Sequence, residues 1–183
     1  MKKKILIFSA GPSGREVFQL ISSINKLDHI WEIIGYVDID SNKIGKMIDG
    51  IHVYSSNNLP KQKEIYAICG TMNSVIRKKI FDKDIIKNGY KLTNLIHPHV
   101  ELPKCFKIGL GNIIFSNVHI SFEVSIKNFS IISNFCDLGH NLIANNYFTI
   151  MPSVTIGGNC TIGEQTFIGS GAKIHQEVEI GSN

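Results

Sequence analysis

The sequence predicts a chain of two different halves, a small α/β domain followed by a parallel β-helix. Two observations support this. Up to about residue 96, apolar runs alternate with helix-like segments, whereas from Ile108 onward every sixth residue is aliphatic. A chain of 183 residues is long enough for two small domains, each with its own core. We place the boundary at His97-Pro98, which gives domains of residues 1–96 and 97–183.

The first half reads as alternating strands and helices. Apolar runs predict strands at residues 5–8, 31–38 and 64–69. Apolar residues at helical spacing predict helices over residues 14–24 and 73–88, the second closed by Gly89. Alternating β and α elements favour a parallel sheet with right-handed crossovers, so we expect a Rossmann-like domain.

The second half has a six-residue period without insertions or deletions. The repeated aliphatic positions are Ile108, Ile114, Ile120, Ile126, Ile132, Leu138, Ala144, Ile150, Ile156, Ile162, Ile168, Ile174 and Ile180. This period fits neither a helix face nor an alternating strand. It fits short parallel strands joined by tight turns, in which each sixth side chain points inward and stacks on its equivalent in the next coil.

Two further features recur with the same period. Four residues after most of the aliphatic positions stands a small or β-branched residue, such as Val118, Val124, Cys136 or Cys160. Ile-Gly pairs occur at residues 156–157, 162–163, 168–169 and 180–181. We expect these glycines to occupy turns that require a positive φ.

Composition and charge argue against several classes of protein, namely secreted, membrane-spanning, nucleic-acid-binding and metal-binding ones. The net charge of +4 is modest, and the one dense basic run, residues 2–4, precedes an apolar stretch too short for a signal sequence. No segment has the length of a membrane span, and nothing requires nucleic acid. The four cysteines lack C-x-x-C or zinc spacing, which favours reduced thiols, a cytoplasmic location and no metal site.

The repeats Ile156-Gly-Gly-Asn-Cys-Thr, Ile162-Gly-Glu-Gln-Thr-Phe and Ile168-Gly-Ser-Gly-Ala-Lys resemble those of the hexapeptide-repeat acyltransferases. With a βαβ domain in front, the whole chain resembles the sialic-acid O-acetyltransferase and UDP-aminosugar N-acetyltransferase group, the NeuD/PglD-like enzymes. The resemblance implies a left-handed β-helix with three hexapeptides per coil and acetyl-CoA as co-substrate. It also implies a nucleotide-linked or sialic-acid-like sugar acceptor, and a homotrimer.

The loop after the first expected strand is a candidate phosphate site. In residues 9–14 it holds Gly11, Ser13 and Gly14 where a G-x-G-x-x-G loop would stand, with serine in place of the first glycine. Backbone N–H groups at a helix N-terminus favour an anion, although a tight strand-to-helix turn explains the same residues. A dinucleotide enzyme is the rival interpretation of this half, but no hydride-transfer site is apparent.

Three more residues of the first half are candidate substrate ligands by resemblance. Asp38 matches the acidic position at the end of the second strand, where related enzymes hold the nucleotide. Gly70 would pass close to the ligand and Asn73 would hydrogen-bond its base. Related proteins often have two adjacent aspartates at this position, whereas this chain has Asp38-Ile39-Asp40.

His140 matches the catalytic histidine of the resembled family. It lies two residues after the inward Leu138, so its side chain belongs to the outer surface of the coil, where an imidazole can act as general base. The acidic neighbour of the family is Asn141 here, which can fix the ring but carries no charge. We therefore consider Asp137, an acid from another subunit, or a non-catalytic protein as alternatives.

Other contacts follow from the resemblance alone. Ser133 and Asn134 stand where the family positions the acceptor sugar, and Thr149, Gly158 and Ser170 stand where it binds acetyl-CoA. Each residue also has a plain interpretation as part of a turn or surface.

The resulting expectation is an acetyl-CoA-dependent sugar acetyltransferase with His140 as base. A scaffold protein and an acetyltransferase for a smaller acceptor are the alternatives. The same base serves O- and N-acetylation, so the sequence leaves that choice open, along with the identity of the sugar and nucleotide. Because the chain stops in the middle of a hexapeptide at Asn183, we expect either a last coil covered by a neighbour or a longer natural protein.

Overall fold

A computed structural model describes residues 2–60 and 64–183. The chain forms two compact units. Unit 1 contains the residues up to Met72 together with Ile76–Thr93, and unit 2 contains Asn73–Val75 together with Asn94–Asn183. Each unit has its own buried apolar core, and each is described separately below.

Unit 1 is built on a six-stranded sheet with the order β3-β4-β2-β1-β5-β6. Its strands are β1 (Lys3–Phe8), β2 (Trp31–Val37), β3 (Met47–Ile48), β4 (Ile51–Tyr54), β5 (Tyr66–Cys69) and β6 (Lys91–Leu92). All neighbouring pairs are parallel except β3 and β4, which form an antiparallel hairpin. Strands β1, β2 and β5 match the three predicted apolar runs, while β3, β4 and β6 were not predicted.

The helices of the first half of the chain start and end close to the predicted positions. α1 (Pro12–Asp28) begins with proline in its first turn and buries the side chains of one face against the sheet, among them Val17 and Ile21. α2 (Ser74–Ile80) continues into a π-helix, η1 (Phe81–Ile86), and Gly89 follows with a φ of 72°. None of the described helices is long and apolar enough to cross a membrane.

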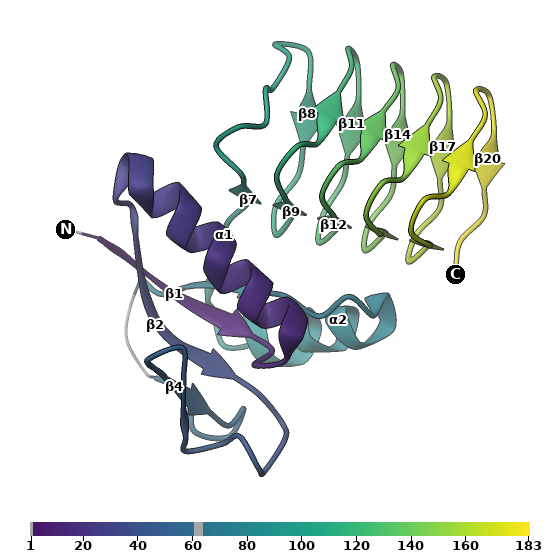
Figure 1. The fold of residues 1–183 in the computed structure, drawn as a ribbon. Coiled ribbons are helices and arrows are strands. Elements are labelled where there is room, and N and C mark those ends of the chain that lie inside the picture. Colours follow the sequence, from purple (N-terminus) through teal and green to yellow (C-terminus); the bar gives the residue numbers. More distant parts are fainter. Residues whose placement is uncertain (1, 61–63) are drawn as a thin grey trace. The chain divides into compact units, whose positions relative to one another are not determined.

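Unit 2 is a coil of two-residue strands that form three parallel sheets (Figure 1). The first sheet contains β8 (Lys107–Ile108), β11 (Ser125–Ile126), β14 (Ile143–Ala144), β17 (Thr161–Ile162) and β20 (Glu179–Ile180). The second contains β10 (His119–Ile120), β13 (Asp137–Leu138), β16 (Thr155–Ile156) and β19 (Lys173–Ile174). The third contains β7 (Leu95–Ile96), β9 (Ile113–Ile114), β12 (Ile131–Ile132), β15 (Thr149–Ile150) and β18 (Phe167–Ile168).

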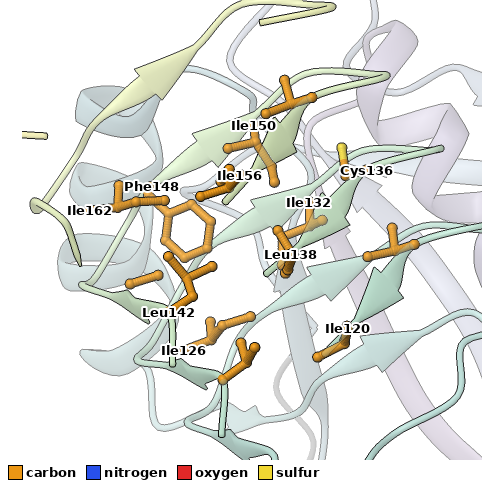
Figure 2. Close-up of a cluster of buried hydrophobic side chains, with 14 of the residues drawn as sticks. Ile120, Ile126, Ile132, Cys136, Leu138, Leu142, Phe148, Ile150, Ile156 and Ile162 are labelled. Carbon is orange, nitrogen blue, oxygen red and sulfur yellow. The ribbon is translucent and has the colours of Figure 1, made fainter. Parts of the chain in front are cut away.

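The pairing register explains the six-residue period. From β8 onward, each strand pairs with the strand 18 residues further along, as Ile126 does with Ala144, so three hexapeptides complete one coil. The periodic aliphatic side chains from Ile114 to Ile168 are buried inside the coil, where those of successive coils stack (Figure 2). This confirms the predicted inward positions. The hexapeptide repeats and parallel strands fit a left-handed β-helix.

The turns correct one prediction about the glycines. A positive φ recurs every six residues, but three residues after the inward position, where Asn117, Asn141 and Asn159 are examples and only Gly111 and Gly171 are glycine. Of the Ile-Gly glycines, Gly157 and Gly163 instead lie close to the backbone of the next coil, whereas a Cβ on Gly169 or Gly181 would meet nothing within 4 Å. A Cβ on Gly157 would lie 2.9 Å from the Cα of Gln176 in the next coil. Close approach of successive coils, and not backbone conformation, therefore requires glycine at such a position.

Candidate active site

His140 and Asn141 lie in the turn that connects β13 to β14. The 18-residue register places Phe122 and Glu123 at the equivalent turn of the preceding coil, and Gly158 at that of the following coil. Backbone hydrogen bonds tie these turns together: Asn141 N donates to Phe122 O (3.1 Å), and Asn159 N donates to His140 O (2.8 Å). Three consecutive coils therefore contribute to the surroundings of one half-buried histidine.

The polar contacts of His140 run along these turns. Its Nδ1 lies 2.8 Å from Oδ1 of Asn141, and Nδ2 of Asn141 donates to Oε2 of Glu123 at 2.7 Å. The amide of Asn141 thus connects the imidazole to a carboxylate one coil away. Sequence reasoning missed Glu123, although its position 18 residues before Asn141 could have identified it once the coil length was known.

Two neighbours set the position of the imidazole plane. The ring of Phe122 stacks on that of His140, with centroids 5.1 Å apart and an angle of 6° between the planes. On the following coil, a Cβ added to Gly158 would come 2.8 Å from Cδ2 of His140, with Nε2 and Cε1 also within contact. Within residues 2–60 and 64–183, Nε2 forms no hydrogen bond, so this nitrogen is available as a proton acceptor.

Asp137 does not contact His140. Its Oδ1 lies 2.7 Å from Nδ1 of His119, on the neighbouring strand β10. Both side chains are exposed, His119 at 72% and Asp137 at 54%. The substitute acid considered for His140 is therefore paired with another histidine, and Glu123 is the carboxylate linked to His140 within this chain.

The other candidates of unit 2 are distributed over the coil. Asn134 and Ser170 lie two coils apart in the turns that follow β12 and β18, a different set of turns from that of His140. Asn134 Nδ2 donates to Oγ of Ser116 (2.9 Å), and Ser170 is exposed. Ser133 and Thr149 are buried. The structure therefore brings only Gly158 among the predicted binding residues of unit 2 into contact with His140.

In unit 1, the loop of residues 9–14 forms a tight connection between β1 and α1. Ser9 has a φ of 108°, a conformation natural to glycine, at the position where the phosphate-binding pattern has its first glycine. A Cβ on Gly14 would clash with the backbone of Ser9, and one on Gly70 would lie 2.9 Å from Cα of Gly14. Gly14 and Gly70 therefore allow the loop, helix and strand β5 to pack closely.

Asp38 binds the same loop. Its Oδ2 accepts a hydrogen bond from Ala10 N (2.7 Å), and its Oδ1 accepts one from Asp40 N (3.0 Å). Lys43 Nζ lies 3.6 Å from Oδ2. Gly11 N also donates within the loop, to Oγ of Ser9 at 3.3 Å. Asp38 thus joins the carboxyl ends of β1 and β2.

The basic last turn of α2 contains a cation whose burial the sequence did not indicate. Arg77 is fully buried and donates to the carbonyl oxygens of Thr71 (2.7 Å) and Met72 (2.9 Å). These carbonyls follow β5, just before the exposed Asn73. Arg77 therefore holds the segment between Gly70 and α2 in place.

A pocket of about 440 Å³ opens at the carboxyl ends of the parallel strands in unit 1. Ser9 and Asp38 line it from the ends of β1 and β2, Thr71 lines it after β5, and Lys79 and Lys83 contribute two cations. The carboxyl end of a parallel sheet is the usual ligand position in open α/β folds.

A second polar cluster of unit 1 was also absent from the sequence predictions. The guanidinium of Arg15 binds both carboxylate oxygens of Asp49, with Nη2 2.7 Å from Oδ1 and Nε 2.9 Å from Oδ2. The hydroxyl of Tyr36 donates to Oδ2 at 2.8 Å. The hydrogen bonds from Arg15, followed by that from Tyr36, hold the pKa of Asp49 below its ordinary value despite partial burial.

Comparison with known proteins identifies the repeat of unit 2. The family described as "Bacterial transferase hexapeptide (six repeats)" matches residues 145–176. GDP-perosamine N-acetyltransferase of Escherichia coli O157:H7 is 28% identical over 175 residues, which cover 94% of this chain and 78% of that protein.

Solved structures share the whole fold. A His-to-Asn variant of perosamine N-acetyltransferase from Caulobacter crescentus, in complex with CoA and GDP-perosamine, matches with a TM-score of 0.86 and 20% identity, covering 98% of this chain and 83% of that one. The acetyltransferase domain of PglB from Neisseria gonorrhoeae, in complex with acetyl coenzyme A, matches with a TM-score of 0.85 and 24% identity, covering 100% of this chain and 86% of that one. The chain therefore carries the hexapeptide repeat of bacterial transferases within a fold that it shares with these acetyltransferases.

Proposed function

We propose that this chain is an acetyl-CoA-dependent N-acetyltransferase that acts on the amino group of a nucleotide-linked aminosugar. The observation that carries the proposal is the state of His140, whose Nδ1 is bound to Asn141 while Nε2 remains open at the surface of the coil. The names of the relatives support both co-substrates, since they include a GDP-perosamine N-acetyltransferase and a domain in complex with acetyl coenzyme A.

The chemistry requires one proton acceptor. The amine of the sugar attacks the thioester carbonyl carbon and forms a C–N bond, and His140 Nε2 takes the proton that the nitrogen loses. The C–S bond then breaks, and the thiolate of CoA leaves with the proton returned by the imidazolium. Stacking on Phe122 and the hydrogen bond to Asn141 keep the ring from rotating during these steps.

Unit 1 is proposed as a Rossmann-like domain that binds the nucleotide. The pocket of about 440 Å³ offers Lys79 and Lys83 to phosphate groups, and its position at the carboxyl ends of the strands supports this assignment. Gly11, Ser13 and Gly14 form the adjacent helix N-terminus, which favours an anion. Asp38 organises this loop through Ala10 N, and Gly70 packs against Gly14 of the same loop. Asn73 stays a proposed contact of the nucleotide base on the family resemblance alone.

We further propose that the active unit is a homotrimer. Asn134 and Ser170, the candidates for acceptor and acetyl-CoA contacts, occupy turns that differ from the turn of His140. A neighbouring copy of the β-helix that places its own turn of Asn134 and Ser170 beside His140 would complete the site. Ser133 and Thr149, both buried in the single chain, are the sequence neighbours of the inward Ile132 and Ile150 in the same sheet.

A thiol-release assay tests the proposal. The protein is mixed with acetyl-CoA and a panel of GDP- and UDP-linked 4-aminosugars, the corresponding hydroxy sugars and free sialic acid. We expect CoA release with a nucleotide-linked aminosugar and an N-acetylated product by mass spectrometry. Release only with hydroxy sugars or sialic acid would contradict N-acetylation. Acetyl-CoA binding by calorimetry without turnover on the whole panel would favour a non-catalytic protein instead.

A further inference from the structure

We infer that Glu123 is a positioning residue that orients the amide of Asn141 and thereby fixes the proton of His140 on Nδ1. The inference rests on the proposed function, because it gives Glu123 a role in preparing His140 as a base. Its physical basis is the continuous contact from Glu123 Oε2 to Asn141 Nδ2 (2.7 Å) and from Asn141 Oδ1 to His140 Nδ1 (2.8 Å).

The direction of these hydrogen bonds follows from the groups involved. An ionised carboxylate only accepts hydrogen bonds, so the Asn141 atom facing Glu123 must be the NH₂ group. The same amide then presents its oxygen to His140. If the amide were rotated, Oδ1 of Asn141 would face the carboxylate of Glu123. Two acceptors would then lie at hydrogen-bond distance with no hydrogen between them, which is unfavourable. Glu123 therefore excludes the wrong orientation of Asn141.

The orientation of the amide decides the tautomer of the imidazole. Because Asn141 Oδ1 can only accept, Nδ1 of His140 must carry the hydrogen. The lone pair of the neutral ring then lies on Nε2, the nitrogen without a partner within residues 2–60 and 64–183. Without Glu123, Asn141 could equally well turn its NH₂ group to Nδ1, which would place the hydrogen on Nε2 and remove the base.

This arrangement replaces a direct acid partner by one that acts through an amide. Glu123 is exposed and is separated from the imidazole by the side chain of Asn141, so its charge acts on His140 weakly. Its main effect is on geometry. The preceding coil thus contributes twice, with Phe122 stacked on the ring and Glu123 bound to the amide.

The test compares three variants of the full chain. Glu123→Ala removes the acceptor and should lower kcat about tenfold or more with little change in KM, because a wrong tautomer disables a histidine base. Alanine adopts the positive φ of residue 123 no less readily than glutamate, so the fold should persist. The double variant Glu123→Gln with Asn141→Asp moves the carboxylate to position 141. The hydrogen bond between residues 123 and 141 then reverses its donor, while Nδ1–H of His140 still donates to residue 141. This double variant should restore kcat to within about threefold of the starting protein.

Asp137→Asn is the matched control. It alters another exposed carboxylate of the coil, one that pairs directly with His119, and it should leave kcat unchanged. A purely structural function of Glu123 would lower the melting temperature of Glu123→Ala in step with its activity, and the double variant would bring no rescue.

Nitrogen-15 NMR of the imidazole tests the inference without any turnover. The starting protein should hold neutral His140 in the Nδ1–H form, and Glu123→Ala should show a mixture with Nε2–H. Retention of the pure Nδ1–H form together with an unchanged kcat in Glu123→Ala would overturn the inference. If no substrate of the panel reacts but the NMR shift appears, the proposed function fails while the positioning by Glu123 stands.

Discussion

Gly158 lies directly against the His140 ring, one coil further along the β-helix. A Cβ built on Gly158 would come 2.8 Å from Cδ2 of His140 and would also touch the Nε2 edge. Glycine is thus needed at this position to leave room for the imidazole. On the preceding coil, the ring of Phe122 stacks on the imidazole. The ring is held between an aromatic side chain on one coil and a bare backbone on the next.

Gly158→Ala should therefore lower kcat by about 10-fold or more, because the methyl group must displace the ring from its position. The melting temperature should change little, since His140 can rotate outward. Gly169→Ala is the matched control, because a Cβ there meets nothing within 4 Å, and it should behave like the starting protein. Equal activity of the Gly158→Ala and Gly169→Ala proteins in the thiol-release assay would contradict the placement of the ring.

His140→Ala should reduce kcat by about 10²-fold or more while the circular dichroism spectrum stays unchanged, which is the usual contribution of a general base. His119→Ala is the informative comparison, because His119 has a direct carboxylate partner in Asp137 but is largely exposed. We expect near-normal activity for His119→Ala. A large loss of kcat in His119→Ala with a small loss in His140→Ala would show that His119, and not His140, is the general base.

The cluster of Arg15, Tyr36 and Asp49 predicts a pH-dependent stability. The folded-state pKa of Asp49 is depressed, chiefly by the hydrogen bonds from Arg15, so its contribution is present above the unfolded value of about 4. The contribution is lost as the pH falls through the lower folded value. Asp49→Asn should therefore be less stable than the starting protein in urea at pH 7, and the difference should shrink near pH 3.

Arg15→Gln provides the control for this prediction, because it removes the partner that chiefly lowers the pKa of Asp49. Arg15→Gln should also be less stable to urea than the starting protein at pH 7, and this difference should also shrink near pH 3. The loss should be modest, since the side chain of Arg15 is 57% exposed and solvent screens the ion pair. A stability difference that grows as the pH falls would show that Asp49 acts in the opposite sense.

Arg77→Met should destabilise the protein to urea by about 1–3 kcal/mol, because the half-buried carbonyls of Thr71 and Met72 would each lose a donor. Arg77→Lys should be more stable than Arg77→Met, since both hydrogen bonds come from the single nitrogen Nη1 and an ammonium group can also donate to two oxygens. Full stability of Arg77→Met would mean that the segment after β5 does not depend on this side chain.

The proposed trimer predicts a molar mass of three chains in light scattering at micromolar concentration. Several large apolar side chains of the coil are exposed in the single chain, among them Phe135 at 63% and Phe167 at 57%, and such residues often mark contact surfaces. Phe135→Asp should shift the mass toward the monomer. A monodisperse monomer of the unmodified protein would contradict the trimer.

Local sequence determined most of the fold. The aliphatic residue at every sixth position, such as Ile132 or Ile150, placed the coil and its inward side chains in the correct register, because each repeat must bury the same position. The runs at β1, β2 and β5 were long enough to be recognised as strands. The two-residue strands β3 and β6 were not, because a periodic pattern needs more residues than they contain.

Only the tertiary structure decided which side chains of the candidate site contact one another. The sequence indicated His140 and the missing charge at Asn141, but contacts across 18 residues depend on which coil lies above which. Only the closed coil brought Glu123 to Asn141, assigned Asp137 to His119 and placed Gly158 against the ring. Hydrogen bonds and steric contacts require distances of about 3 Å, and such distances between separate coils follow from packing and not from local pattern.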